Sequence, residues 1–152
     1  MKWEKEAVKV YEEAKEYVDT LCVPLSPISL KNAEIASRLA NQNKSIHILA
    51  NELERQYMGR IFLSPGYIYS QSSNFEEEVS KLNQWVKAIY QKEFPHIFYL
   101  TYDVKWKKVE SYLDGTLIWI PASKIEDYQS RQAKEEIQNQ MHQISELIRT
   151  FW

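Results

Sequence analysis

The stretch Ile97-Phe98-Tyr99-Leu100-Thr101-Tyr102 decides the fold class of this chain. Successive side chains of a strand point to opposite faces of a sheet, and here both faces receive apolar or aromatic side chains. A continuous run of this kind is typical of a strand that is covered on two sides, as in parallel sheets. The stretch therefore predicts a parallel β-sheet with helices on both faces.

Three further short apolar runs are each closed by a proline or a hydroxyl residue, and we expect them to be extended as well. They are Leu21-Cys22-Val23-Pro24-Leu25-Ser26, Arg60-Ile61-Phe62-Leu63-Ser64-Pro65 and Thr116-Leu117-Ile118-Trp119-Ile120-Pro121. In the first run, Pro24 and the following Pro27 remove two backbone hydrogen-bond donors. This favours a short or edge strand there, or a loop with an extended backbone.

Segments with helical periodicity lie between these runs. The spacing of apolar residues predicts helices over about residues 4–18, 30–40, 45–57, 74–90 and 133–148. Ser29 could cap the second of these, the polar stretch 41–44 interrupts it, and Ser45 begins the third. A capping-box pattern at Ser123 and Glu126 precedes the last helix.

The connection between the third and fourth apolar runs decides whether their strands are parallel. It is about a dozen residues long, which is near the minimum for a parallel crossover. Asp114-Gly115 could instead close a hairpin. The helical spacing of Trp106, Val109 and Leu113 favours the crossover.

The length and composition fit one folded domain. The chain has 152 residues, of which 44% are hydrophobic and 26% charged. We therefore predict a single α/β domain over residues 1–152. Its fold class is a three-layer sandwich with a small, mostly parallel sheet of about four strands, Rossmann-like or flavodoxin-like.

The charge and hydropathy patterns exclude two classes of partner. The net charge is −2 and no long basic stripe exists, so we expect no nucleic-acid binding. No run approaches the ~18 apolar residues of a membrane span. The charged amino terminus does not resemble a signal peptide, and we expect a cytoplasmic protein.

The glycine and histidine positions argue against several kinds of catalytic or cofactor site. The three glycines, Gly59, Gly66 and Gly115, build neither a G-x-G-x-x-G motif nor a P-loop, and no G-x-S-x-G motif occurs. The three histidines are scattered without metal-ligand spacing. We therefore expect no metal and no cofactor, while the question of enzymatic activity stays open.

The carboxyl ends of the predicted strands are the first place to look for a binding site, because ligands of open parallel sheets lie at that edge. Asp103 could bind a hydroxyl group or act as a base there, but it could equally cap the following helix. The candidate binding residues at this edge are Ser64, Thr101, Tyr102, Asp103 and Ser123.

Aromatic residues make up 13% of the chain, which is high and favours large side chains at layer boundaries or at an interface. Phe151 and Trp152 end the chain. They could pack back onto the domain or anchor a partner surface. The lone Cys22 lies in an apolar run, and we expect a buried, reduced thiol.

Several segments together resemble one protein family. They are Met1-Lys2-Trp3, Ala14-Lys15-Glu16-Tyr17-Val18-Asp19-Thr20, Glu54-Arg55-Gln56-Tyr57-Met58-Gly59-Arg60, His96-Ile97-Phe98-Tyr99-Leu100-Thr101 and Leu113-Asp114-Gly115-Thr116-Leu117-Ile118-Trp119-Ile120-Pro121. In this combination the chain is similar to the YpiF family of uncharacterised bacterial proteins. The resemblance implies no established activity and supplies no catalytic residues.

Two functional hypotheses follow from these observations. The favoured one is a non-catalytic binding or regulatory protein that acts through protein–protein contacts, because catalytic motifs are missing and aromatic residues are abundant. The alternative is a small-ligand-binding protein or enzyme that uses the strand-end edge around Asp103. The sequence does not decide the oligomeric state.

Overall fold

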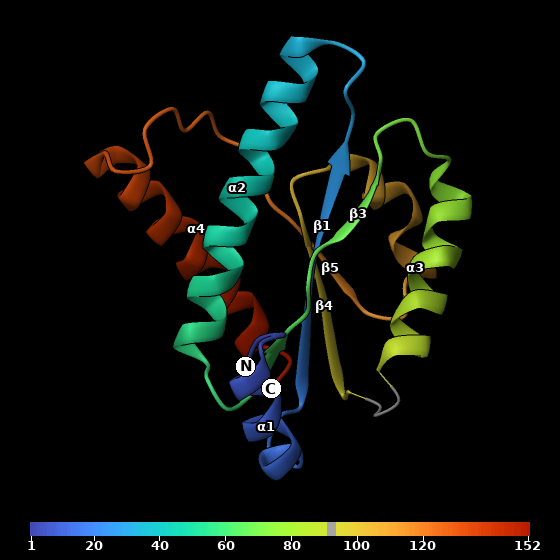
Figure 1. Ribbon diagram of the computed structural model, residues 1–152, viewed down its shortest axis with the longest axis vertical. Helices are drawn as coiled ribbons and strands as arrows, with labels where there is room; N and C mark the ends of the chain where they lie inside the picture. Colours follow the sequence, from blue (N-terminus) through green and yellow to red (C-terminus); the bar gives the residue numbers. More distant parts are fainter. Residues whose placement is uncertain (91–93) are drawn as a thin grey trace.

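The computed structural model describes residues 1–90 and 94–152, which fold into alternating helices and strands (Figure 1). The predicted α/β sandwich is confirmed. In chain order the elements are α1 (Lys5–Ala14), β1 (Thr20–Ile28), α2 (Ala33–Gln56), β2 (Ile61–Leu63), β3 (Tyr67–Ser70), α3 (Phe75–Ile89), β4 (His96–Thr101), the 3₁₀ helix η1 (Val104–Tyr112), β5 (Thr116–Trp119) and α4 (Arg131–Arg149).

The sheet is parallel at every strand pair among the described residues, and its order is β2-β1-β4-β5 with β3 also paired to β1. β2 pairs with the first half of β1 and β3 pairs with the second half. The two short strands therefore lie end to end along the same side of β1. β4 and β5 pair in parallel, as the helical spacing between them predicted, and not as a hairpin.

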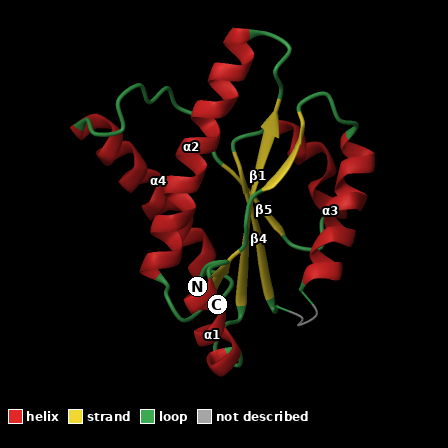
Figure 2. Ribbon diagram, viewed as in Figure 1, coloured by secondary structure: helices red, strands yellow, loops and turns green. Residues whose placement is uncertain are grey.

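Helices cover both faces of this sheet (Figure 2). α2 and α4 pack on one face against Cys22 and Phe98, whereas α3 and η1 pack on the other against Leu21 and Tyr99. This alternation explains why residues 97–100 of β4 are all apolar or aromatic. No helix within the described ranges is long and apolar enough to cross a membrane.

β1 is a central strand, so the expectation of an edge strand or loop is wrong. The N–H of Ser64 donates to Cys22 O at 2.9 Å, which shows that even-numbered residues of β1 face β2 and β3. Pro24 faces the same side, in the interval between the two short strands. Pro27 faces the other side, beyond the last β4 pair at Leu25. Neither missing donor interrupts a ladder.

α2 is one continuous helix, and the predicted interruption at 41–44 is wrong. The Asn41 side chain donates to Ile125 O at 2.8 Å, and the Tyr128 hydroxyl donates to Asn41. The polar residues therefore tie the helix to the 121–130 segment instead of ending it. The helix is capped by Asn32, whose side chain accepts from Ile35 N, and not by Ser29.

The last helix begins later than the Ser123 capping box suggested. α4 starts at Arg131, and the Ser130 side chain accepts from Ala133 N at 3.1 Å. Residues 121–130 instead form an irregular segment held by the α2 contacts. The capping-box pattern at Ser123 and Glu126 did not predict the helix start, because Ser130 supplies the N-cap immediately before the apolar periodicity of α4.

The turn before β5 has no room for a side chain at Gly115. A Cβ built there would lie 2.6 Å from Ile97 O and 2.8 Å from Ile97 Cβ. We expect Gly115→Ala to lower the free energy of unfolding by ~1–3 kcal/mol, because the backbone must shift. At Gly66 the nearest atom is 3.3 Å away on the His47 side chain, so Gly66→Ala should cost less in urea denaturation. Equal costs for both variants would contradict this account.

Burial controls the chemistry of the Cys22 thiol, which is reduced and enclosed as expected. Desolvation raises the pKa of Cys22 to about 12 from a reference of 9.0. The folded protein should therefore resist iodoacetamide at pH 8, and denatured protein should react fully. Between about pH 9 and 12 only the unfolded state loses this proton, so the contribution of Cys22 to stability should fall as pH rises. Rapid labelling of the native protein would refute the assignment.

Candidate functional site

The predicted edge around Asp103 lies where the chain order of the sheet reverses, between β1 and β4. One carboxyl oxygen of Asp103 accepts from the Tyr69 hydroxyl at 2.7 Å, and the other accepts from Lys105 N at 3.1 Å. The Tyr69 hydroxyl in turn accepts from the Trp106 indole at 2.8 Å. Both carboxyl oxygens of Asp103 are therefore engaged within the domain, and the residue caps η1.

The other candidate residues at the strand ends do not form one cluster. Thr101 is buried, donates to Leu25 O at 3.2 Å and accepts from Asp103 N at 3.0 Å. The Tyr102 hydroxyl bonds Gln140 on α4 at 3.2 Å. Ser123 lies in the irregular segment before α4.

Ser64 lies away from this group because β2 is short. β2 ends beside Cys22, in the first half of β1, whereas Thr101 pairs with Leu25 on the other side of that strand. The Ser64 hydroxyl donates to Pro65 O at 2.8 Å. The structure therefore brings Thr101 and Asp103 together and leaves Ser64 out.

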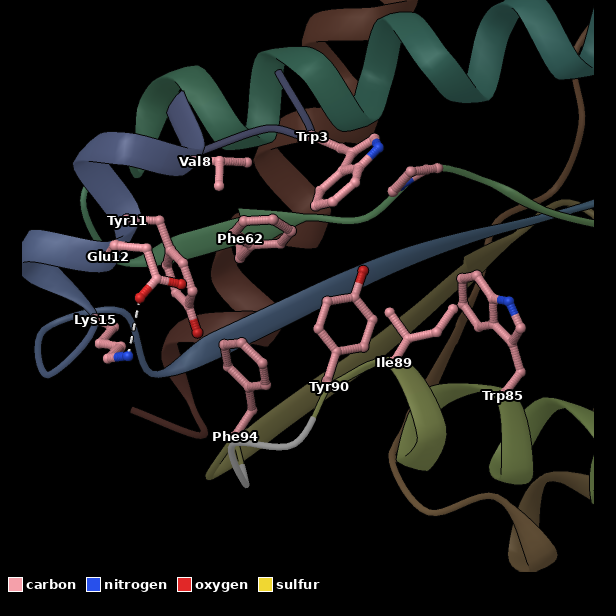
Figure 3. Close-up of a pocket in the computed structure, with 11 residues that line it drawn as sticks. Trp3, Val8, Tyr11, Glu12, Lys15, Phe62, Trp85, Ile89, Tyr90 and Phe94 are labelled. Atoms are coloured by element: carbon pink, nitrogen blue, oxygen red, sulfur yellow. Dashed lines mark hydrogen bonds and ion pairs between the residues drawn. The ribbon is translucent and has the colours of Figure 1, made fainter. Parts of the chain in front are cut away.

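A different feature has the size and lining of a binding site. A cavity of about 520 Å³ lies on the α3 side of β2, within the range of ligand pockets (Figure 3). We call it the aromatic groove. Its aromatic lining residues are Trp3, Tyr11, Phe62, Trp85, Tyr90 and Phe94.

Three separate elements place these rings around one space. Tyr11 projects from α1, while Trp85 and Ile89, one helical turn apart, project from the end of α3. Phe62 on β2 links the two walls, because its ring centroid is 5.0 Å from Tyr11 and 6.0 Å from Tyr90, both edge to face. These separations are typical of stable aromatic pairs.

The amino-terminal segment is held beside β2, and this fixes the wall that carries Trp3. Lys2 forms a parallel bridge with Leu63, whose N–H donates to Met1 O at 2.6 Å. The Met1 ammonium forms a buried ion pair with Glu54 at 2.7 Å. The position of Trp3 therefore depends on the Met1–Glu54 ion pair, which ties the amino-terminal segment to α2.

Among the residues that the structure describes, the lining of the groove carries no net formal charge. Its ionisable pair, Glu12 and Lys15, forms a salt bridge at 3.0 Å. Burial raises the pKa of Tyr90, and burial followed by the Glu12 charge raises the pKa of Tyr11. Both phenols therefore stay protonated at neutral pH, and the groove favours an uncharged, apolar occupant.

The indole donors divide into two groups. Those of Trp106, Trp119 and Trp152 donate to Tyr69, to Tyr102 O and to Thr20 at 2.8, 3.2 and 2.8 Å, respectively. Within residues 1–90 and 94–152, the indoles of the groove, Trp3 and Trp85, donate to no protein acceptor. Trp3 is 68% exposed and the Trp85 nitrogen is not among the buried polar atoms without a partner, so both indole donors lie at the rim of the groove and are open to solvent.

The terminal aromatic residues pack against the domain. The Phe151 ring lies 5.4 Å from Phe98, edge to face, and 42% of Phe151 is exposed. The Trp152 ring lies under the Arg60 guanidinium at 3.9 Å. Phe151 is exposed and Trp152 is partly exposed, and their role as an anchor for a partner stays a prediction.

Sequence reasoning did not find the aromatic groove. The signal that it offered was the spacing of Trp85 and Ile89 on one helix face, which was indistinguishable from core periodicity. That Trp3 faces them depends on the bridge at Lys2, which joins residues 61 positions apart. No local pattern encodes such a contact.

The fold and its site define a three-layer α/β domain with a parallel sheet and an aromatic groove beside an edge strand. Among the described residues, no group of three or more His, Cys, Asp or Glu side chains could hold a metal ion.

The chain belongs to the DUF2487 family, "Protein of unknown function (DUF2487)", whose model matches residues 9–152. It is 35% identical over 107 residues to "Uncharacterized protein YpiF" of Bacillus subtilis (strain 168). The aligned region covers 70% of this chain and 69% of that protein. The resemblance to the YpiF family is thus confirmed. No solved structure matches the chain.

Proposed function

We propose that this chain is a non-catalytic binding protein that acts through protein–protein contacts, with the aromatic groove as its contact surface. The observation that carries the proposal is the exposed apolar rim of the groove. Trp3 is 68% exposed and Ile89 is 52% exposed, and both line the same cavity as the buried rings of Phe62 and Phe94. A partly open aromatic pocket with an exposed apolar rim suits the anchoring of a partner protein.

The hydrogen bonds at the strand-end edge support this proposal over the small-ligand alternative. Asp103 already accepts from Tyr69 and Lys105, and Thr101 is bonded to Leu25 O. A ligand at that edge would have to compete with these internal partners. The groove, by contrast, offers apolar surface and two indole donors without breaking any internal bond described here.

Site-specific photocrosslinking in the native host tests the proposal. A benzophenone amino acid replaces Ile89 in one variant and Leu147 in a second. Leu147 is a matched control, because it is 42% exposed and also lies near the end of a helix, α4, outside the groove. We expect a discrete protein adduct from position 89 alone.

A second comparison links the adduct to the groove itself. Adding Trp85→Ala to the position-89 variant should remove the adduct, because the change deletes one wall of the cavity. An equally strong adduct from position 147, or one that survives Trp85→Ala in a folded variant, would overturn the proposal. Absence of any adduct at position 89 would overturn it as well.

A further inference from the structure

We propose that the open edge of β5 is a dimerisation surface, on which a second copy of this chain adds its own β5 in the antiparallel direction. The sheet of each copy then continues into the other across a twofold axis at Ile118. The inference is independent of the proposed function, because β5 lies at the opposite edge of the sheet from β2, whose Phe62 lines the aromatic groove.

The ladder between β4 and β5 determines which backbone groups of β5 face outward. Ile120 N donates to Thr101 O at 2.9 Å, so the even-numbered residues of β5 direct their N–H and C=O groups toward β4. Leu117 and Trp119 therefore direct theirs away from the sheet. Within the described parts of the chain, the backbone groups of these two residues have no hydrogen-bond partner.

β5 lacks the features that usually protect a sheet edge, such as a charged side chain, a proline or a covering strand. The strand Thr116–Trp119 contains no charged residue and no proline. Leu117 and Trp119 are both partly exposed. By contrast, the outer side of β2 is occupied, because Lys2 forms a bridge with Leu63. The edge of β5 is therefore available to another strand.

The edge of β3 is a poorer template for pairing. Gln71 N donates to Ile28 O, so Ile68 and Ser70 are the residues of β3 that face outward. Ser70 O already accepts from Ser73 N at 3.0 Å. One outward acceptor of β3 is thus used within the domain, whereas both outward residues of β5 keep their donors and acceptors.

The pattern of free groups on β5 is self-complementary. Alternating backbone donors and acceptors are matched by another extended backbone. Leu117 and Trp119 lie symmetrically about Ile118, so in an antiparallel pair Leu117 of each copy exchanges both backbone hydrogen bonds with Trp119 of the other. A second β5 therefore satisfies every outward group of the strand. Because β5 is short, we expect the dimer to dissociate on dilution.

The charges beside the edge select a second copy in the antiparallel direction. Lys107 Nζ lies 5.6 Å from the centre of the Trp119 ring, near one end of β5, and Asp114 precedes Thr116 at the other end. Both charged residues are exposed, and neither has an ion-pair partner in residues 1–90 and 94–152. Antiparallel pairing brings Lys107 of one copy to the same end of the interface as Asp114 of the other, whereas a parallel neighbour would place like charges together.

The other charged residues of η1 are compatible with this arrangement. Lys105 and Lys108 line a cavity with Glu76 at the start of α3, away from the β5 edge. Glu110 shares a face of η1 with Lys107, because side chains three residues apart are eclipsed in a 3₁₀ helix. Glu110 also lies further along η1 toward the start of β5. It therefore adds to the negative charge that faces Lys107 of the second copy.

Analytical ultracentrifugation of the full chain and of charge-swap variants tests the proposal. We expect a monomer–dimer equilibrium in which dimers predominate at about 100 µM chain. Lys107→Asp and Asp114→Lys should each weaken association by about tenfold or more, and the double variant should restore it. Lys108→Asp is the matched control on the same helix and should associate like the unmodified chain, because Lys108 faces α3. Circular dichroism should show that these exposed substitutions leave the fold intact.

Amide hydrogen exchange, followed residue by residue by NMR at the dimer concentration, locates the contact. The N–H groups of Leu117 and Trp119 should exchange slowly in the dimer and at least about tenfold faster in Asp114→Lys. The N–H of Ile118 already faces β4 and should change little between the two proteins. This alternation is expected for a strand pair at the β5 edge and not for contacts between helices.

Three results would overturn the proposal. The first is a chain that stays monomeric up to about 500 µM. The second is a dimer in which the N–H groups of Leu117 and Trp119 still exchange rapidly, which would place the contact elsewhere on the surface. The third is a Lys107→Asp/Asp114→Lys double variant that associates as weakly as either single variant, which would exclude the antiparallel charge pairing.

Discussion

Replacing Glu54 with glutamine should lower the free energy of unfolding by ~3–5 kcal/mol, the cost of breaking a buried ion pair from one side. Glu54 is only 4% exposed and lies 2.7 Å from the Met1 ammonium, with Lys2 Nζ at 3.9 Å. Glutamine retains the volume but leaves a buried cation without an anion. Urea denaturation, monitored by circular dichroism, measures the change.

Glu52→Gln is the matched control for Glu54→Gln on the same helix. Glu52 pairs with Arg55 at the surface, where such pairs contribute ~0–1 kcal/mol. A Glu54→Gln variant that is as stable as Glu52→Gln would refute the structural importance of the Met1–Glu54 pair. Glu54→Gln should also loosen the segment that carries Trp3, so the NMR signal of the Trp3 indole N–H should broaden or move.

Trp106→Ala should cost ~3–5 kcal/mol, because it removes a large, fully buried side chain. Trp106 has no exposed surface and lies edge to face with Tyr69 and Phe75 at 5.2 and 5.0 Å. The change also deletes the indole donor to the Tyr69 hydroxyl. Thermal unfolding by calorimetry and urea titration should agree on the loss.

Tyr112→Ala provides the control on the same element, η1, because Tyr112 is 70% exposed. Its effect should stay within about 0.5 kcal/mol. Trp106→Phe should fall between the two variants, since it keeps most of the ring volume and loses the hydrogen bond. If Trp106→Ala unfolds at the same urea concentration as Tyr112→Ala, then the packing of η1 on the sheet is described wrongly.

The sequence predicts the sheet well because burial on two faces leaves a direct mark on composition. The apolar β4 run and the helical spacing after it correctly indicate a parallel crossover to β5. Asp103 also caps η1, as one of its two interpretations requires. These predictions depend on contacts within a single strand or within one helical turn.

The failures have a common physical origin in contacts between distant residues. Pro24 is tolerated in a central strand because β2 and β3 leave an interval beside it. Asn41 does not end α2 because Ile125 and Tyr128 satisfy its polar groups from more than 80 residues away. Local propensity cannot anticipate partners that the tertiary fold supplies.

The candidate site shows the same difference between local patterns, which the sequence reveals, and contacts between distant residues, which it does not. Sequence reasoning placed the functional edge at Asp103 from the general behaviour of parallel sheets, whereas the aromatic groove assembles from α1, β2 and the end of α3. Each contributing residue has an ordinary local explanation as a core or surface side chain. Only the packing of the amino-terminal segment beside β2 brings Trp3 to the residues of α3.

Hydrogen–deuterium exchange on the full chain, with and without the protein captured at position 89, tests the central claim most directly. The account predicts slower exchange in peptides covering residues 3–15 and 85–90, which form the two walls of the groove. Peptides covering residues 101–112, around Asp103 and η1, should be unchanged. Protection confined to residues 101–112 would contradict the account and place the contact at the strand-end edge.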